Sequence, residues 1–304
     1  MFSVLRQPAR TLYRPARAYV TQKNESAEVG TSTTEVAAEE SEEKKELPML
    51  QRPLGVKEPP SSLRKSWGES QYETIIDKGK LIDQRKHLVK QIGKGYYEDL
   101  INTRHWGGKT WIAPKTVIRE DKALYFPDIV GKSLDKGAEV HTTDLLRGKI
   151  STVGILGTQI SDEHIRYFVL PTNEALFQNP EYPEYQHVLI NLQENYLRSM
   201  LVNLFTSRLR KSTPPELHPT YLLSSQDMEY QREAIGLDNK HIGYVYLVDE
   251  NLKIRWAGGG DAKVEESEAL LRCTKVLLER LQQKKAGSKK SGKPAKEKPT
   301  PPGS

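Results

Sequence analysis

Cysteine is almost absent from this chain, because Cys273 is the only one among 304 residues. A single cysteine cannot form a disulfide within the chain, so a disulfide framework is excluded. Long hydrophobic runs are missing too, since no stretch approaches the roughly 18 apolar residues of a membrane-spanning helix. The residues present, 36% hydrophobic and 28% charged, indicate a folded core with substantial polar tails.

The net charge of +6 is distributed unevenly along the sequence. The C-terminal stretch 283–304 holds seven lysines against one glutamate, and the first 19 residues hold four arginines and no acid. The chain between these two stretches therefore carries a net charge of −4. A whole-chain pI of about 9.1 does not, for this reason, indicate a basic nucleic-acid-binding surface on the folded part.

Residues 1–19 have the composition of a mitochondrial presequence: arginines, hydroxyl side chains, scattered apolar residues and no acid. A secretory signal would need a continuous apolar core, which is absent here. Arg17 stands three positions before Val20, which predicts processing between Tyr19 and Val20. The alternative is an ordinary basic end, and Pro8 and Pro15 limit any helix.

Residues 20–62 are rich in Glu, Ser, Thr and Pro and poor in aromatics, so we expect a disordered linker there. The next stretch, 63–120, reads as a helical and extended N-terminal arm. Apolar residues recur at helical spacing over 70–103, although glycines weaken the pattern. This arm either lies on a membrane or partner protein, or docks on the main domain.

An α/β pattern runs from 121 to 282, and the Lys-rich stretch 283–304 reads as a basic, disordered tail. Apolar runs predict strands at 150–156, 186–191 and 221–223, the first two buried. Helical patterns cover 162–176, with Pro171 as a break, as well as 195–211 and 227–235.

The stretch 243–261 predicts an antiparallel hairpin, with strands at 244–248 and 253–256 around a turn at Asp249. Gly258–Gly260 is expected to end the sheet, and Asp261 to cap a final helix at 261–282. A β-β-α ending of this kind closes a thioredoxin-like (peroxiredoxin-like) domain. We therefore expect an α/β fold with a central mixed sheet flanked by helices.

Such domains usually perform thiol chemistry at the turn that follows the first central strand, where a helix N-terminus lowers a thiol pKa. Here the turn reads Gly157-Thr158-Gln159-Ile160-Ser161-Asp162, without a thiol, and Ser161 or Asp162 is expected to cap the helix. Cys273 falls inside the last helix, where it is expected to be a packed or helix-surface thiol. The redox cysteines of this fold are thus lacking, which points to a binding or assembly role.

No catalytic, cofactor-binding or metal-binding residue is predicted. Gly107-Gly108-Lys109-Thr110 resembles the end of a phosphate-binding loop, but Thr103 replaces the required first glycine and Pro114 prevents a following helix. The seven histidines show no metal-ligand spacing. His164 is expected to be a solvated residue at a helix start.

The predicted helix 195–211 has an apolar sector wider than the ~100° stripe of an ordinary surface helix. We expect one side of it to pack on the sheet and the surplus to bind a hydrophobic partner protein. The alternative is a helix buried on both sides. The candidate partner-binding residues are Leu197, Met200, Leu204, Phe205 and Arg208.

Several long segments together resemble one family. They are KALYFPDIVGKSL at 122–134, LRGKISTVGIL at 146–156, NLQENYLRSMLVNLFTSRLRK at 191–211 and REAIGLDNKHIGYVYLVDENLKIRWAGGGDA at 232–262. With the presequence, they resemble a fungal member of the mitochondrial ATP synthase assembly factor family, of the ATPase complex subunit ten (ATP-ten) type. The resemblance covers roughly residues 120–282.

This resemblance implies a non-enzymatic assembly chaperone for the Fo sector, which binds newly made subunit a and promotes its joining to the subunit c ring. The implied location is the matrix side of the mitochondrial inner membrane, with peripheral contact and no membrane-spanning segment. It implies no nucleic acid, small-molecule substrate or cofactor. Lys240-His241-Ile242-Gly243 also lacks the proline that lies beside the thiols in thioredoxins and peroxiredoxins.

Three other functions compete with this interpretation. A thioredoxin-like redox protein is disfavoured by the thiol-free turn. A mitochondrial RNA- or ribosome-binding protein could use the Lys-rich tail, although the acidic body argues against it. A metal-delivery factor is disfavoured by the lack of Cys and His ligands.

Overall fold

The computed structural model describes residues 47–62, 108–193 and 206–291, which belong to one compact unit spanning Glu46–Ser304. The presequence with its cleavage position at Tyr19 and Val20 lies outside the described residues. So do most of the expected linker, the arm from 63 to 107, and the tail from 292 onwards. Those expectations stay predictions. In the described part, no helix is both long and apolar enough to cross a membrane.

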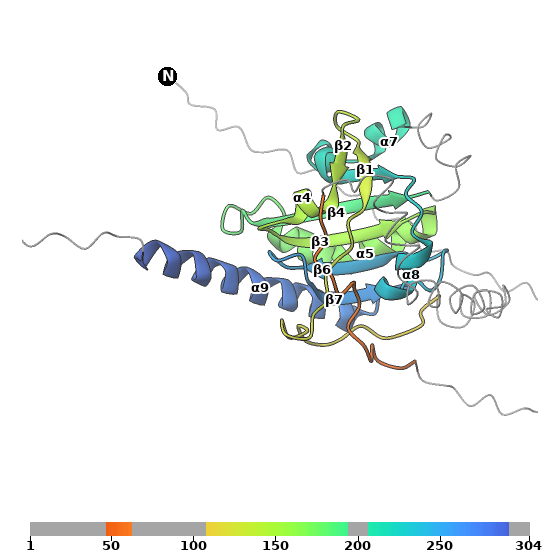
Figure 1. Cartoon of the computed structure of the whole chain (residues 1–304). Coiled ribbons are helices and arrows are strands. Elements are labelled where there is room, and N and C mark those ends of the chain that lie inside the picture. The colour runs from red at the N-terminus through yellow and green to blue at the C-terminus, as the bar shows by residue number, and fades with distance from the viewer. Residues whose placement is uncertain (1–46, 63–107, 194–205, 292–304) are drawn as a thin grey trace, which may run out of the picture. The chain divides into compact units, whose positions relative to one another are not determined.

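A seven-stranded mixed sheet in the order β2-β1-β5-β4-β3-β6-β7 forms the centre of the fold (Figure 1). Strands β3, β4 and β5 are parallel, whereas β6 runs antiparallel to β3 and β7 antiparallel to β6. Every residue of β3 and β4 is buried, as expected of strands covered on both faces. The strands are β1 Val130–Ser133, β2 Glu139–His141, β3 Ile150–Leu156, β4 Tyr185–Leu192, β5 Tyr221–Ser224, β6 Tyr244–Val248 and β7 Ile254–Gly259.

Helices cover both faces of this sheet and enclose two apolar clusters, which confirms the expected α/β arrangement. Helices α5 and α9 close one cluster, whereas the other lies on the opposite face beneath α4, the start of α8 and the segments that precede β1. The helices are α4 Thr142–Leu146, α5 Gln159–Leu176, α7 Thr206–Ser212, a 3-10 turn Pro215–Thr220, α8 Glu229–Ile235 and α9 Val264–Ser291.

The predicted strands and the closing hairpin are confirmed, but the glycines after Trp256 act differently from our expectation. Gly258 and Gly259 continue β7 instead of ending it. A Cβ at Gly258 would lie 2.7 Å from the Trp256 ring, and one at Gly259 would lie 2.7 Å from the Tyr244 ring. These glycines therefore make room for aromatic side chains on the two faces of the sheet.

The helix starts and breaks also differ from the sequence expectations. Helix α5 runs continuously through Pro171, although a proline inside a helix removes one hydrogen bond. Asp261 does not begin α9, which starts at Val264. The carboxylate of Glu266 accepts the N–H of Lys263 at 2.9 Å and so satisfies a donor at the helix start.

Part of the expected linker belongs to the folded domain, which corrects our prediction for 20–62. Leu54 is buried in the core, and Val56 exchanges two backbone hydrogen bonds with Tyr125, at 2.8 and 2.9 Å. Gly55 has a φ of +131°, and a Cβ there would lie 2.6 Å from the Tyr125 carbonyl oxygen. An isolated leucine in a polar stretch gives no periodic signal, so the sequence did not reveal this contact.

The predicted boundary between arm and domain at residue 120 is also wrong. Residues 108–126 belong to the domain, because they cover the outer edge of β7. Ile118 donates its N–H to the Arg255 carbonyl at 2.8 Å and accepts from the Arg255 guanidinium at 2.7 Å. The Trp256 indole N–H donates to the Pro114 carbonyl at 2.7 Å. Covering an edge strand in this way removes its free hydrogen-bonding groups from reach of other chains.

A buried ion pair fixes the start of this edge segment. The ammonium group of Lys109 lies 2.6 Å from the Glu266 carboxylate and donates to the Asp261 carbonyl at 2.6 Å, with both charged side chains under 5% exposed. The other carboxylate oxygen of Glu266 accepts the N–H of Ala113 at 2.8 Å. Burial lowers the pKa of Lys109, and the Glu266 carboxylate opposes that shift.

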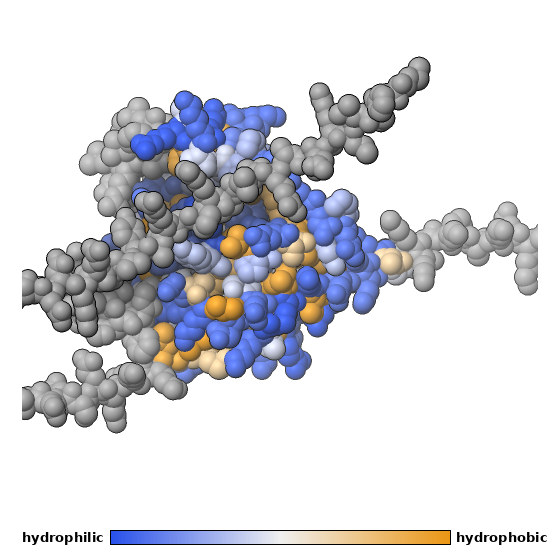
Figure 2. Space-filling view, turned by 180° about the vertical axis from the view of Figure 1, so that it is seen from behind, coloured by the Kyte–Doolittle hydropathy of each residue, from blue (hydrophilic) through white to orange (hydrophobic). Residues whose placement is uncertain are grey.

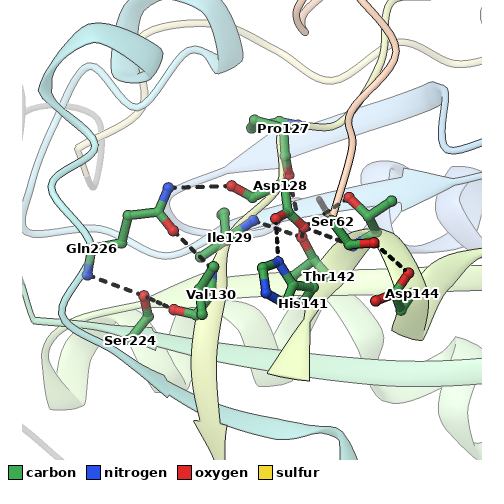
Figure 3. A network of polar contacts seen from close by, with 11 residues as sticks. Ser62, Pro127, Asp128, Ile129, Val130, His141, Thr142, Asp144, Ser224 and Gln226 are labelled. Atoms are coloured by element: carbon green, nitrogen blue, oxygen red, sulfur yellow. Dashed lines mark hydrogen bonds and ion pairs between the residues drawn. The ribbon is translucent and has the colours of Figure 1, made fainter. Parts of the chain in front are cut away.

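A second polar network joins the hairpin β1–β2 to helix α4 (Figure 3). Asp128 accepts from the N–H and the hydroxyl of Thr143 at 3.0 and 2.7 Å, and its other oxygen lies 2.6 Å from Nδ1 of His141. Ser62 donates to Asp144 at 3.0 Å. Asp128 thus satisfies a donor in the first turn of α4, where His141 provides no side-chain cap.

Histidine 187 lies inside the cluster beneath α5. Its Nδ1 is 3.0 Å from the hydroxyl oxygen and 3.2 Å from the carbonyl oxygen of Thr152, whose hydroxyl also bonds Tyr185 at 2.9 Å. Complete burial lowers the pKa of His187 to about 4. The folded protein therefore holds this ring neutral.

We predict that Glu266→Gln lowers the free energy of unfolding by about 3 kcal/mol, because the buried ammonium of Lys109 loses its countercharge. Urea unfolding of the full chain measures this change. The matched control is Glu268→Gln in the same helix, which removes an exposed pair with Arg272 and should cost at most about 0.5 kcal/mol. Equal effects of both changes would contradict the assigned role of Glu266.

We also predict a pH dependence from His187. Its folded pKa of about 4 lies below the unfolded value of about 6.5, so its stabilising effect is complete above about pH 6.5 and is lost as the pH falls towards 4. Between about pH 6.5 and about pH 5, this loss amounts to about 2 kcal/mol. Urea midpoints of His187→Gln should show a smaller acid loss than those of the native chain, and parallel losses would disprove the prediction.

Candidate functional site

The candidate site lies at the carboxyl edge of β3 and β4, where ligands bind in many open α/β sheets. The turn from β3 into α5 closes on itself there. Thr158 accepts the N–H of Ser161 at 3.1 Å, and the Ser161 hydroxyl oxygen accepts the N–H groups of Gly157 and Thr158 at 3.0 and 2.8 Å. Thr158 is therefore the capping residue, with Ser161 as its partner in a capping box, which corrects our expectation of Ser161 or Asp162.

The loop before β6 presses against this turn. Thr158 donates its hydroxyl to the His241 carbonyl at 3.2 Å, and a Cβ at Gly243 would lie only 2.2 Å from the Ser161 carbonyl oxygen. Only glycine fits this approach. The two hydroxyls at the start of α5 are thus engaged with backbone groups of the turn and of the neighbouring loop.

His164 reaches the same loop from the second turn of α5. It is half-buried, and its Nδ1 accepts from the N–H of Gly243 at 3.4 Å. Burial lowers the pKa of His164, and the nearby charge of Asp261 opposes this shift. The expectation that His164 is a solvated residue at a helix start is therefore wrong, because its ring is half-buried and bonds the loop before β6.

A small pocket, partly open to solvent, adjoins the turn. Its lining combines apolar side chains with the polar or charged residues Arg232, Asn239 and Lys240. Gln193, at the end of β4, donates to the Gly157 carbonyl at 3.0 Å and ties the two strand ends together. The pocket is lined by Ile155, Leu156, Gly157, Leu192, Arg232, Leu237, Asn239, Lys240, Ile242 and Tyr244.

The thiol of the chain lies away from this edge. Cys273 is 3% exposed and packs within α9 against the α5 side of the sheet, as expected. Burial raises its pKa to about 11, so the reactive thiolate is disfavoured at neutral pH. Among the described residues, no group of three or more His, Cys, Asp or Glu side chains could hold a metal ion.

Of the five predicted partner-binding residues, the structure describes only Arg208. Leu197, Met200, Leu204 and Phe205 lie outside the described residues, whereas Arg208 is exposed on α7. None of the α7 residues is buried, but Arg210 donates to the backbone carbonyls of Leu134 and Asp135. The sequence interpretation missed the pocket, because its lining comes from four separate segments.

These features define the class of the domain. The order β7-β6-β3-β4 with β6 reversed, and helices on both faces, is that of a thioredoxin-like fold, here with hydroxyls where a redox turn carries thiols. Solved structures with this fold overlay weakly. A putative thiol:disulfide interchange protein DsbE from Chlorobium tepidum shares 15% identity at a TM-score of 0.36, covering 51% of this chain and 96% of that one. An uncharacterized conserved protein from Geobacillus kaustophilus shares 14% identity at a TM-score of 0.39, covering 56% and 87%.

The sequence comparisons are more specific. The family described as "ATP10 protein" matches residues 34–277. The mitochondrial ATPase complex subunit ATP10 of Candida glabrata is 31% identical over 73% of this chain and 81% of its own length. Its counterpart in Saccharomyces cerevisiae is 30% identical over 76% and 88%. This chain therefore belongs to the ATP10 protein family, which confirms the resemblance noted from its motifs.

Proposed function

We propose that this protein is a non-enzymatic assembly factor of the mitochondrial ATPase complex. The observation that carries the proposal is its membership of the ATP10 protein family, whose curated fungal members are named as subunits of that complex. The site agrees with a binding role. Its turn carries Thr158 and Ser161, both held by backbone contacts, and the sole thiol is buried elsewhere.

The proposed client is newly made subunit a of the Fo sector, which the protein would help to join the subunit c ring. An unassembled membrane subunit exposes polar groups and small-residue interfaces to lipid, so a partner at its matrix-facing edge would protect it. The proposed location is the matrix side of the inner membrane, in peripheral contact with it. No nucleic acid, cofactor or small-molecule substrate has a role in this proposal.

The proposed client surface is the apolar sector of the segment 195–211. Its exposed end at Arg208 is consistent with an accessible surface, and α7 is held to the body through Arg210 and the partly buried Leu209. Met200 and Phe205 supply adaptable and bulky apolar contacts in this sector.

Crosslinking and pull-down of the tagged protein, while mitochondria synthesise radiolabelled subunits, tests the proposal. We predict recovery of newly made subunit a and not of the finished complex. Recovery of ribosomal RNA or of mixed-disulfide partners instead would support one of the two competing functions and refute this one.

The double variant Met200→Asp/Phe205→Asp should lower client recovery about tenfold, because two charges enter an apolar interface, while the urea midpoint stays near the native value. The matched control places the same charges at Ser207 and Ser212, which are exposed on α7, and should bind normally. If the first variant unfolds, Met200 and Phe205 belong to the core and the assigned surface is wrong.

A further inference from the structure

The outward face of α5 carries large apolar side chains that the domain does not bury. In the part of the chain that the structure describes, five large hydrophobic side chains are exposed, and three of them lie on α5: Ile160, Tyr167 and Leu170, at 58, 61 and 42% exposure. Their spacing of seven and three residues places them on one side of the helix. The core is packed by other positions of α5, such as Ile165 and Phe168. Figure 2 shows the side of the sheet that α5 and α9 cover, with separate apolar patches among hydrophilic side chains.

Two glutamates share this side of α5. Glu163 and Glu174 are exposed and follow the same helical spacing. The single arginine of α5, Arg166, lies 2.6 Å from the carboxylate of Asp162, whereas neither glutamate has an ion-pair partner among the described residues. The helix therefore presents apolar groups together with two available negative charges, over a length of about 20 Å. We call this face the α5 stripe: Ile160, Glu163, Tyr167, Leu170 and Glu174.

The start of α9 widens the stripe at one end. The ammonium group of Lys109 donates to the Asp261 carbonyl at 2.6 Å and lies 5.0 Å from the centre of the Phe168 ring, so this end of the chain segment lies beside α5. Val264 and Glu265, the first two residues of α9, are both exposed there. They repeat the combination of an apolar side chain and a carboxylate.

The position of the stripe agrees with the proposed client surface at 195–211. The described end of that segment, α7, packs Leu209 against the same apolar cluster that α5 and α9 close. Both surfaces therefore lie on one side of the sheet, where a single client can contact both.

We propose that the α5 stripe binds a cationic amphipathic helix of the membrane-embedded client. The choice of client rests on the proposed function. Loops on the side from which a membrane protein is inserted carry an excess of Lys and Arg, so the matrix-facing segments of a newly made subunit would be basic. The apolar side of such a helix would cover Ile160, Tyr167 and Leu170, and its cations would pair with Glu163 and Glu174.

The charge of the stripe argues against other occupants. Helix α5 holds three acidic residues and one arginine, so it repels anionic lipid headgroups and nucleic acid phosphates. A second copy of the chain, bound through the same face, would bring like charges together around the two-fold axis. A basic helix is the partner that neutralises the glutamates and buries the apolar groups at once.

Fluorescence anisotropy of labelled peptides, titrated with the full chain, tests the proposal. The probe is an amphipathic peptide of Leu and Lys about 18 residues long, compared with the same pattern of Leu and Glu and with a scrambled Leu/Lys order. The apolar variant is Ile160→Ser/Tyr167→Ser/Leu170→Ser, and the charge variant is Glu163→Lys/Glu174→Lys. The matched charge control reverses two exposed acids outside α5, Glu58→Lys/Glu139→Lys, and the apolar control is Met49→Ser.

We expect the native chain to bind the amphipathic Leu/Lys peptide more tightly than the scrambled one, and less tightly at high salt. The apolar and charge variants should each bind it about tenfold more weakly or worse, while both controls bind like the native chain. The charge variant should also bind the Leu/Glu peptide more tightly than the charge control does, although the two have the same net charge.

Several results would overturn the proposal. They are equal weakening of the charge variant and its control, unchanged affinity of the charge variant, and a native chain that sediments as a dimer and becomes monomeric in the apolar variant. The last result would assign the stripe to a second copy. If the apolar variant unfolds in urea far below the native midpoint, the charge variant alone decides, because its substitutions leave the apolar side chains in place.

The outcome is separable from the fate of the proposed function. If the Leu/Lys peptide binds as expected but newly made subunit a is not captured, the stripe stands and the assembly role fails. If the native chain and both variants capture subunit a equally, while none binds the peptide, the stripe is refuted and the assembly role stands.

Discussion

The carboxylate of Glu266 joins the segment 108–126 to the start of α9, and the covering of the sheet edge depends on it. It pairs with the buried ammonium of Lys109, accepts the N–H of Ala113 and completes the start of α9 through Lys263. A buried charge without its partner is costly, so these segments are held together or separate together. The segment 108–126 then lies along β7 and covers the edge of the sheet.

This arrangement gives a thioredoxin-like scaffold that is stabilised without disulfides and carries hydroxyls at its usual site of chemistry. The Thr158 and Ser161 side chains form hydrogen bonds at the start of α5, and Thr158 also bonds the neighbouring loop. Gly243 brings that loop so close that no side chain fits between them. The hydroxyls at the carboxyl edge are therefore engaged in holding the backbone, and a small pocket of mixed polar and apolar lining lies beside them.

Much of the central domain was predictable from sequence, because apolar runs such as 150–156 and the alternating hairpin at 244–248 have strong local signals. The thiol-free turn was visible for the same reason. The packing of 47–62 and 108–126 against the domain was not predictable, since the burial of Leu54 and Trp111 depends on contacts far along the chain and follows no periodic pattern. The pair of Lys109 and Glu266, separated by 157 positions, leaves no local pattern at all.

The C-terminal boundary failed for another reason. We expected α9 to end at 282, where its apolar periodicity stops, but lysine and alanine favour helix and the ion pairs of Lys284 and Lys285 extend it to Ser291. Loss of apolar periodicity marks the end of packing and not the end of a helix. In α9, the helix therefore continues beyond its last apolar contact as an exposed extension.

The scaffold should work without thiol chemistry, and a cysteine-free variant can show whether it does. In cells that lack their own copy, the Cys273→Ala variant contains no cysteine at all, and the assembled ATPase complex can be quantified on native gels. We expect the same amount of complex as with the native chain. A variant that accumulates and folds normally, yet leaves the complex unassembled, would contradict it.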